Sequence, residues 1–229
     1  MAFASIKAAA KAGKDFEPIP AGVHVAVCTQ VIDLGFQEGF SSKYGAKRKV
    51  YLKFEIPGVT VSWEKNGQPM SGPGTIGREF GLSISEKSHV RPFLVGWRGK
   101  EFTPAEEAGF EITSVIGKVC QLNVVHETGK DGKKVYANIA AAFPLVQLQR
   151  DDIKANPAKY KPSQPVLVYS PDAHDQAIYD QLPEWIRKKI DTRVADPSAK
   201  EDDGAGFTGA DDSVPPGEDS EFGHPPLDF

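Results

Sequence analysis

Lysine, arginine and aromatic side chains are interleaved in two glycine-bearing segments of this 229-residue sequence. The first segment carries Phe36, Phe40, Lys43, Tyr44, Lys47, Arg48 and Lys49, and the second carries Lys130, Lys133, Lys134 and Tyr136. Cationic side chains attract phosphates, and flat rings stack on unpaired bases at about 1–3 kcal/mol per base. Each residue type is common in loops, so the prediction of nucleic-acid binding depends on their joint occurrence.

Strands with period-two alternation are predicted on both sides of the first segment. Residues 22–34 alternate as a long first strand, and residues 49–56 place Val50, Leu52, Phe54 and Ile56 on one face of a second strand. The opposite face of that second strand then carries Tyr51 and Lys53 beside Lys49. Tyr51 and Lys53 therefore join the candidate DNA-binding residues.

The remaining elements predict a mainly β fold. Residues 59–84 indicate a third strand region, broken by a turn at Asn66-Gly67 and a loop at SGPGTIG, and residues 85–100 indicate a short helix interrupted at Pro92. Residues 120–125 and 134–139 form a β-hairpin with a basic tip. Three strands, a helix and two strands is the order of a five-stranded OB-type β-barrel, whose binding face lies between the loops after strands one and four. Such barrels also bind oligosaccharides and protein partners.

Charge divides the chain unevenly. Residues 1–195 hold 26 Lys and Arg against 21 Asp and Glu, whereas residues 196–229 hold ten acids against one base, Lys200. We expect an N-terminal arm at residues 1–18, the barrel at 19–148, a proline-punctuated extension at 149–194 and a disordered acidic tail at 195–229. Within the extension, residues 176–190 predict an amphipathic helical segment containing Ile178, Leu182, Trp185 and Ile190.

The acidic tail ends in the apolar tip PPLDF, and a purely solubilising tail needs no terminal Phe. This tip resembles that of bacterial and phage single-stranded DNA-binding proteins, although the bacterial consensus has two acidic residues before a Pro-Phe end. The body, from PAGVHVAVCTQVIDLG through SISEKSHVRPFLVGWRGKEFT to GKVCQLNVV, is similar over roughly residues 20–145 to bacteriophage OB-fold proteins of the replication module.

The resemblance implies a protein that protects single-stranded DNA and recruits partners in replication, recombination or repair in the host cytoplasm. Leu227, Asp228 and Phe229 would then bind a replication or recombination protein, and the tail acids would occupy the basic groove weakly when DNA is absent. A homo-oligomer is compatible with this reading.

Other chemistries find little support in the sequence. Cys28 and Cys120 alternate with apolar residues and are expected to be buried free thiols. The histidines are scattered, GPGTIG lacks a surrounding βαβ unit, and neither a catalytic motif nor a metal or cofactor site is evident. Trp63 is expected in the core, whereas the position of Trp97 is left open.

We expect no enzyme, because no catalytic motif is recognisable, and no membrane segment, because no run of about eighteen apolar residues occurs. The alternatives are a phage nuclease or other DNA-processing enzyme, which would degrade DNA in the presence of divalent ions, and a structural or scaffold protein, which would assemble without nucleic-acid affinity.

Overall fold

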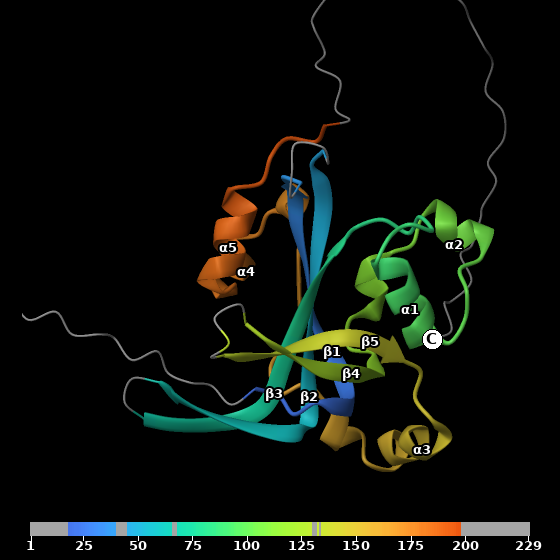
Figure 1. Cartoon of the computed structure of the whole chain (residues 1–229), viewed down its shortest axis with the longest axis vertical. Coiled ribbons are helices and arrows are strands. Elements are labelled where there is room, and N and C mark those ends of the chain that lie inside the picture. The colour runs from blue at the N-terminus through green and yellow to red at the C-terminus, as the bar shows by residue number, and fades with distance from the viewer. Residues whose placement is uncertain (1–17, 40–44, 66–67, 130–131, 133, 198–229) are drawn as a thin grey trace, which may run out of the picture.

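A mainly β architecture is found in the computed structural model, which describes residues 18–39, 45–65, 68–129, 132 and 134–197 (Figure 1). The strands are β1 (Gly22–Gln37), β2 (Lys47–Lys65), β3 (Gln68–Gly81), β4 (Val119–Thr128), β5 (Val135–Phe143) and the short β6 (Leu167–Tyr169). The first five are ordered β3-β2-β1-β4-β5 with antiparallel neighbours, and β6 pairs in parallel with β1. The predicted mainly β class is confirmed. The predicted N-terminal arm and most of the acidic tail lie outside the described residues.

The sheet bends around β1 and remains open. Residues 22–27 of β1 pair with β4, whereas residues 27–37 pair with β2. In the described residues no backbone ladder joins β3 to β5. Instead, Nη1 of Arg78 on β3 donates hydrogen bonds to the carbonyl oxygens of Ile139 (2.8 Å) and Ala140 (3.0 Å) on β5. The two edge strands are therefore held side by side by a side chain.

A helix between β3 and β4 covers the concave side of the sheet. In α1 (Val90–Arg98), Val90, Phe93, Leu94 and Trp97 are buried in the main core, and Trp97 Nε1 donates to the carbonyl of Val119 at 3.2 Å. Pro92 does not interrupt this helix, contrary to the prediction. It lies in the first turn, where its missing N–H has no intrahelical partner to lose. The short helices α2 (Pro104–Ala108) and η1 (Ile112–Val115) lead into β4.

The glycine- and proline-rich stretch SGPGTIG lies within β3, so the predicted loop is wrong. Strand β2 also continues to Lys65, which pairs with Gln68 of β3, and residues 66–67, where a turn is predicted, lie outside the described residues. Glycine is favoured at positions 72, 74 and 77 because a large side chain from a neighbouring segment occupies the space where a Cβ would lie. Those side chains are Trp63 at Gly72, Ile19 and Val59 at Gly74, and Tyr51 at Gly77. Trp63 thus lies over Gly72 and is half-buried rather than in the core.

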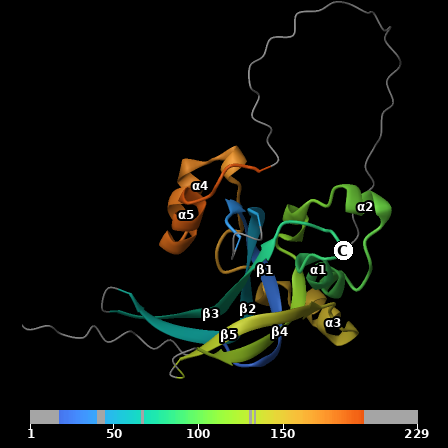
Figure 2. The same ribbon diagram turned by 45° about the horizontal axis from the view of Figure 1, so that its top comes forward.

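The C-terminal extension packs on the convex side of β1 and β2. Its elements are α3 (Gln147–Ala155), η2 (Pro157–Tyr160), β6, η3 (Pro171–Ala173), α4 (Gln176–Gln181) and α5 (Glu184–Asp191). Ile32 and Leu34 of β1 form a second buried cluster with Tyr169, Leu182, Ile186 and Ile190. In Figures 1 and 2, α4 and α5 lie on one side of β1 and β2, and α1 and α2 lie on the other.

The predicted single helical segment is two helices, because Pro183 separates α4 from α5. Of the predicted apolar residues, Leu182 and Ile190 are buried with Ile32 and Leu34 of β1 and Ile178 packs against them, but Ile186 is buried in place of Trp185. No helix in the described part of the chain is long and apolar enough to span a bilayer.

Substitution Gly96→Ala should destabilise the fold although alanine favours helices. An added Cβ would lie 2.4 Å from the carbonyl oxygen of Ala142, a backbone atom fixed by the sheet. We expect the overlap to outweigh the propensity gain of about 1 kcal/mol and to lower the free energy of unfolding by about 1–3 kcal/mol. Chemical denaturation measures this loss. Gly81→Ala, with open space around the added carbon, is the matched control, and a more stable Gly96→Ala protein would contradict this packing.

Candidate nucleic-acid interface

The structure describes only some of the predicted binding residues. Phe40, Lys43, Tyr44, Lys130, Lys133 and the tip residues Leu227, Asp228 and Phe229 lie outside the described residues. The others fall in three places: the paired ends of β1 and β2, the convex face of β2, and β5.

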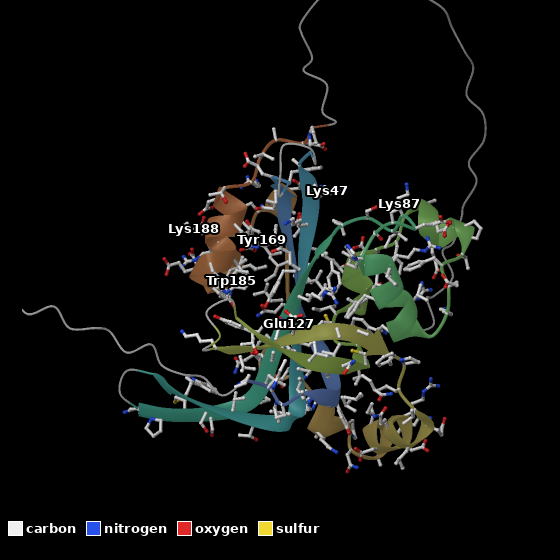
Figure 3. The ribbon with its side chains drawn as sticks, viewed as in Figure 1. Lys47, Lys87, Glu127, Tyr169, Trp185 and Lys188 are labelled. Carbon is white, nitrogen blue, oxygen red and sulfur yellow. The ribbon has the colours of Figure 1, made fainter. Side chains whose placement is uncertain are left out.

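At the paired ends of β1 and β2, Arg48 holds the extension in place. Its guanidinium hydrogen-bonds Asp33 on β1 through Nε at 3.0 Å, and Nη2 bonds both Asp33 and Asp172 of η3. The hydrogen bond to Asp33 raises the pKa of Arg48 further above its usual value. Phe36 lies opposite Arg48, and its carbonyl accepts from the amide of Val194 at 2.8 Å. Arg48 is thus engaged by two carboxylates, while the neighbouring Lys47 is exposed (Figure 3).

On the convex face of β2, Tyr51 contacts Trp185 of α5. Their ring centroids are 5.1 Å apart at an interplanar angle of 86°, and the Tyr51 phenol lies over Gly77 of β3. Burial raises the pKa of Tyr51 to about 12. Trp185 itself remains 47% exposed, so part of its ring is available to a ligand while the contact with Tyr51 holds it in place.

Trp185 is the site residue that sequence reasoning assigned to helix packing. Ile186 and Ile190 are four positions apart and form the buried stripe of α5. Trp185 precedes Ile186 by one position, or about 100° around the helix, which turns its ring toward β2 and the solvent. The spacing of Ile186 and Ile190, taken with the break at Pro183, is the sequence signal that could have revealed this.

Lys49 and Lys189 share one carboxylate beside the aromatic pair. Lys49 Nζ lies 2.8 Å from Oε1 of Glu79, and Lys189 Nζ bonds Oε2. Burial of Glu79 by itself would raise its pKa, but the hydrogen bonds from Lys189 and Lys49 outweigh burial and hold the pKa below its usual value. Two cations against one carboxylate leave this group with a net positive charge. Lys189 also lies 5.9 Å from the centre of the Trp185 ring.

Lys53 lies further along the same face of β2 and is half-buried. Burial lowers the pKa of Lys53, and attraction to Glu55 opposes that shift. Glu55 is itself buried, and its carboxylate accepts hydrogen bonds from the amide (3.0 Å) and Oγ (2.6 Å) of Ser163 in the extension. In the part of the chain that the structure describes, no carboxylate forms an ion pair with Lys53.

Lys134 and Tyr136 lie at the start of β5, where both are exposed, Tyr136 by 53%. Asn138, two positions along, donates to Glu127 of β4 at 2.7 Å. Since Arg78 ties β5 to β3, the outward side chains of β5 continue the surface of β2 and β3.

We call this surface the basic aromatic face. It consists of Lys49, Tyr51, Lys53, Lys134, Tyr136, Trp185 and Lys189. Figure 3 shows Trp185 on α5, with Tyr169 between α5 and the strands, and Glu127 on β4. Three acids near this face, Glu55, Glu79 and Glu127, are each hydrogen-bonded within the protein, while Glu184, which precedes Trp185 on α5, is exposed. Such a surface can bind a polyanion that carries flat rings.

Groups suited to covalent or metal chemistry are not gathered at this surface. Among the described residues, no three His, Cys, Asp or Glu side chains lie close enough together to hold a metal ion. Cys28 and Cys120 are free thiols buried in the core. Burial raises the pKa of the Cys28 thiol to about 12 and that of Cys120 well above its usual value, which keeps both in the weakly nucleophilic protonated form.

No protein-family model matches the sequence, and no curated protein is detectably similar to it. The function is therefore inferred from the geometry and charge of the basic aromatic face.

The packing of Tyr51 predicts a specific loss of stability at alkaline pH. The folded protein keeps the Tyr51 proton up to about pH 12, whereas an unfolded chain loses it near pH 10. The folded state therefore binds more protons in this window, and the unfolding free energy falls as pH rises above about 10. Denaturation at several pH values should show a shallower decline for Tyr51→Phe than for the unaltered chain. Tyr136→Phe, which changes an exposed ring, is the control, and identical slopes for all three proteins would contradict the assignment.

Proposed function

We propose that this protein binds single-stranded DNA without sequence preference through the basic aromatic face. The observation that carries the proposal is the pair of exposed rings, Tyr136 on β5 and Trp185 on α5, each beside a lysine: Lys134 is two positions from Tyr136, and Lys189 lies 5.9 Å from the Trp185 ring. A single strand presents phosphates and unstacked bases together, so its binder needs both positive charge and flat side chains.

The arrangement of the strands supports an OB-type fold as the scaffold. Three features favour a partly open five-stranded barrel: the order β3-β2-β1-β4-β5, the helix α1 between β3 and β4, and the approach of β5 to β3. Oligonucleotides bind to OB-folds on the face of strands 2 and 3. In this chain α5 covers part of that face and contributes Trp185 and Lys189 to it.

The lack of sequence preference follows from the groups available. Every base has a face on which Tyr136 or Trp185 can stack, and lysine ammonium groups recognise phosphates as point charges. The cellular role is then to protect single-stranded DNA in replication, recombination or repair. In the same proposal Leu227, Asp228 and Phe229 recruit a protein partner.

The first test is fluorescence anisotropy of labelled oligo(dT) and its matched duplex with the full chain. We expect tighter binding to the single strand, weakened about 5- to 150-fold by Tyr136→Ala, because one stacked base contributes about 1–3 kcal/mol. Phe143→Ala is the matched control, since Phe143 is an exposed ring at the opposite end of β5. Absence of binding at low salt would reject the proposal and favour a scaffold protein.

The contribution of Lys53 should appear in the salt dependence of that binding. A cation that contacts one phosphate of a single strand contributes about 0.7 to the slope of log affinity against log salt concentration. Lys53→Met keeps most of the buried stem and removes the charge, so the slope should become shallower by about 0.7. Lys154→Met on α3 removes an exposed charge away from the face and should leave the slope unchanged. Equal slopes for the two variants would exclude a phosphate contact at Lys53.

A further inference from the structure

A second concave site lies away from the basic aromatic face, between α1, the start of β4 and α3. It has a volume of about 310 Å³, at the small end of the range for ligand sites. In Figure 1, α1 and α3 lie on the opposite side of the molecule from α5. The lining residues are Trp97, Arg98, Lys118, Val119, Pro144, Leu145, Arg150 and Ile153.

The lining of this pocket combines two chemistries. Trp97, Val119, Leu145 and Ile153 provide apolar surface, whereas cationic side chains enter from three separate elements. Those cations are Arg98 on α1, which is paired with Glu106, together with Lys118 before β4 and Arg150 on α3. The pocket therefore suits a small apolar group that carries negative charge.

We propose that the occupant is residues 225–229 of the same chain, the PPLDF tip. Leu227 and Phe229 supply apolar side chains, and Asp228 supplies a negative charge between them. An apolar peptide that carries a carboxylate matches both the apolar and the cationic lining of the pocket.

The length of chain beyond Pro197 permits this docking. Phe229 is separated from Pro197 by 32 positions, a length that spans up to about 110 Å when fully extended. That length is several times the diameter of a small domain, which is about 30 Å, so the pocket lies within reach of the tip. Covalent linkage gives the tip an effective concentration on the order of millimolar, so even a weak contact is populated.

Docking of the tip at this pocket would not cover the basic aromatic face, unlike binding of the tail acids to that face. Trp97 and Trp185 belong to helices on opposite sides of the sheet, so an occupied pocket leaves the basic aromatic face open to DNA. It instead withholds the tip from any protein partner, which must compete with Lys118 and Arg150 for Asp228.

The three tryptophans provide the test, because Trp97 lines the pocket whereas Trp63 and Trp185 do not. Indole N–H signals of the ¹⁵N-labelled full chain are compared with those of a variant carrying Leu227→Ala and Phe229→Ala. We expect the Trp97 signal alone to shift. Lys118→Glu combined with Arg150→Glu should move the Trp97 signal and abolish its response to the tip substitutions, whereas Lys154→Glu, elsewhere on α3, should preserve that response.

Two results would overturn the proposal. An unchanged Trp97 signal, or a shift at Trp185 instead, would remove the tip from this pocket. A Trp97 shift that vanishes on dilution would assign the occupant to a second copy of the chain. The experiment contains no DNA, so its outcome is independent of the proposed DNA binding.

Discussion

Burial of both faces of β1 is the constraint on which the rest of the structure depends. Val31 points into the main core, whereas Ile32 and Leu34 point to the opposite side. Each large aliphatic side chain removed from water contributes about 1.5–3 kcal/mol, so the convex side of β1 requires its own cover. The extension supplies that cover with Tyr169, Leu182, Ile186 and Ile190, and it is therefore part of the folded body.

The same constraint builds the candidate DNA-binding surface. Once α5 packs on Ile32 and Leu34, Trp185 meets Tyr51 and Lys189 meets Glu79. The carboxylate of Glu79 is shared by two lysines, which fixes both ammonium groups near the exposed Trp185 ring without cancelling their combined charge. The ion pairs thus hold the two lysine side chains in place, and the excess of cations makes this part of the surface positively charged.

Alternation and charge in the sequence predicted much of the fold, and the exceptions have specific physical causes. The period-two pattern placed Leu52 and Phe54 in the core and located the β4–β5 hairpin correctly. The glycines and proline of SGPGTIG predict a loop when only backbone freedom is considered. The glycines serve instead as space for Trp63, Ile19 and Tyr51, which come from distant positions that no local pattern reveals.

The candidate site was less predictable than the fold for the same reason. Tyr51, Lys53 and Lys49 were identified from strand alternation, but their cover by the extension depends on contacts more than a hundred residues apart, such as that of Glu55 with Ser163. Trp185 was missed because a single helix was expected across Pro183. Phe36 and Arg48 were grouped with DNA ligands, whereas the structure pairs Arg48 with Asp33 and Asp172.

The Arg78 contact joins the two edge strands of this bent sheet at a single point. A backbone ladder would fix the spacing of β3 and β5 at one value for every residue pair. The guanidinium of Arg78, placed over the Phe80 ring at 4.9 Å, instead bonds the carbonyl oxygens of Ile139 and Ala140. The approach of β5 to β3 therefore depends on the length and charge of one side chain, and a change at Arg78 would alter it while every backbone ladder stays intact.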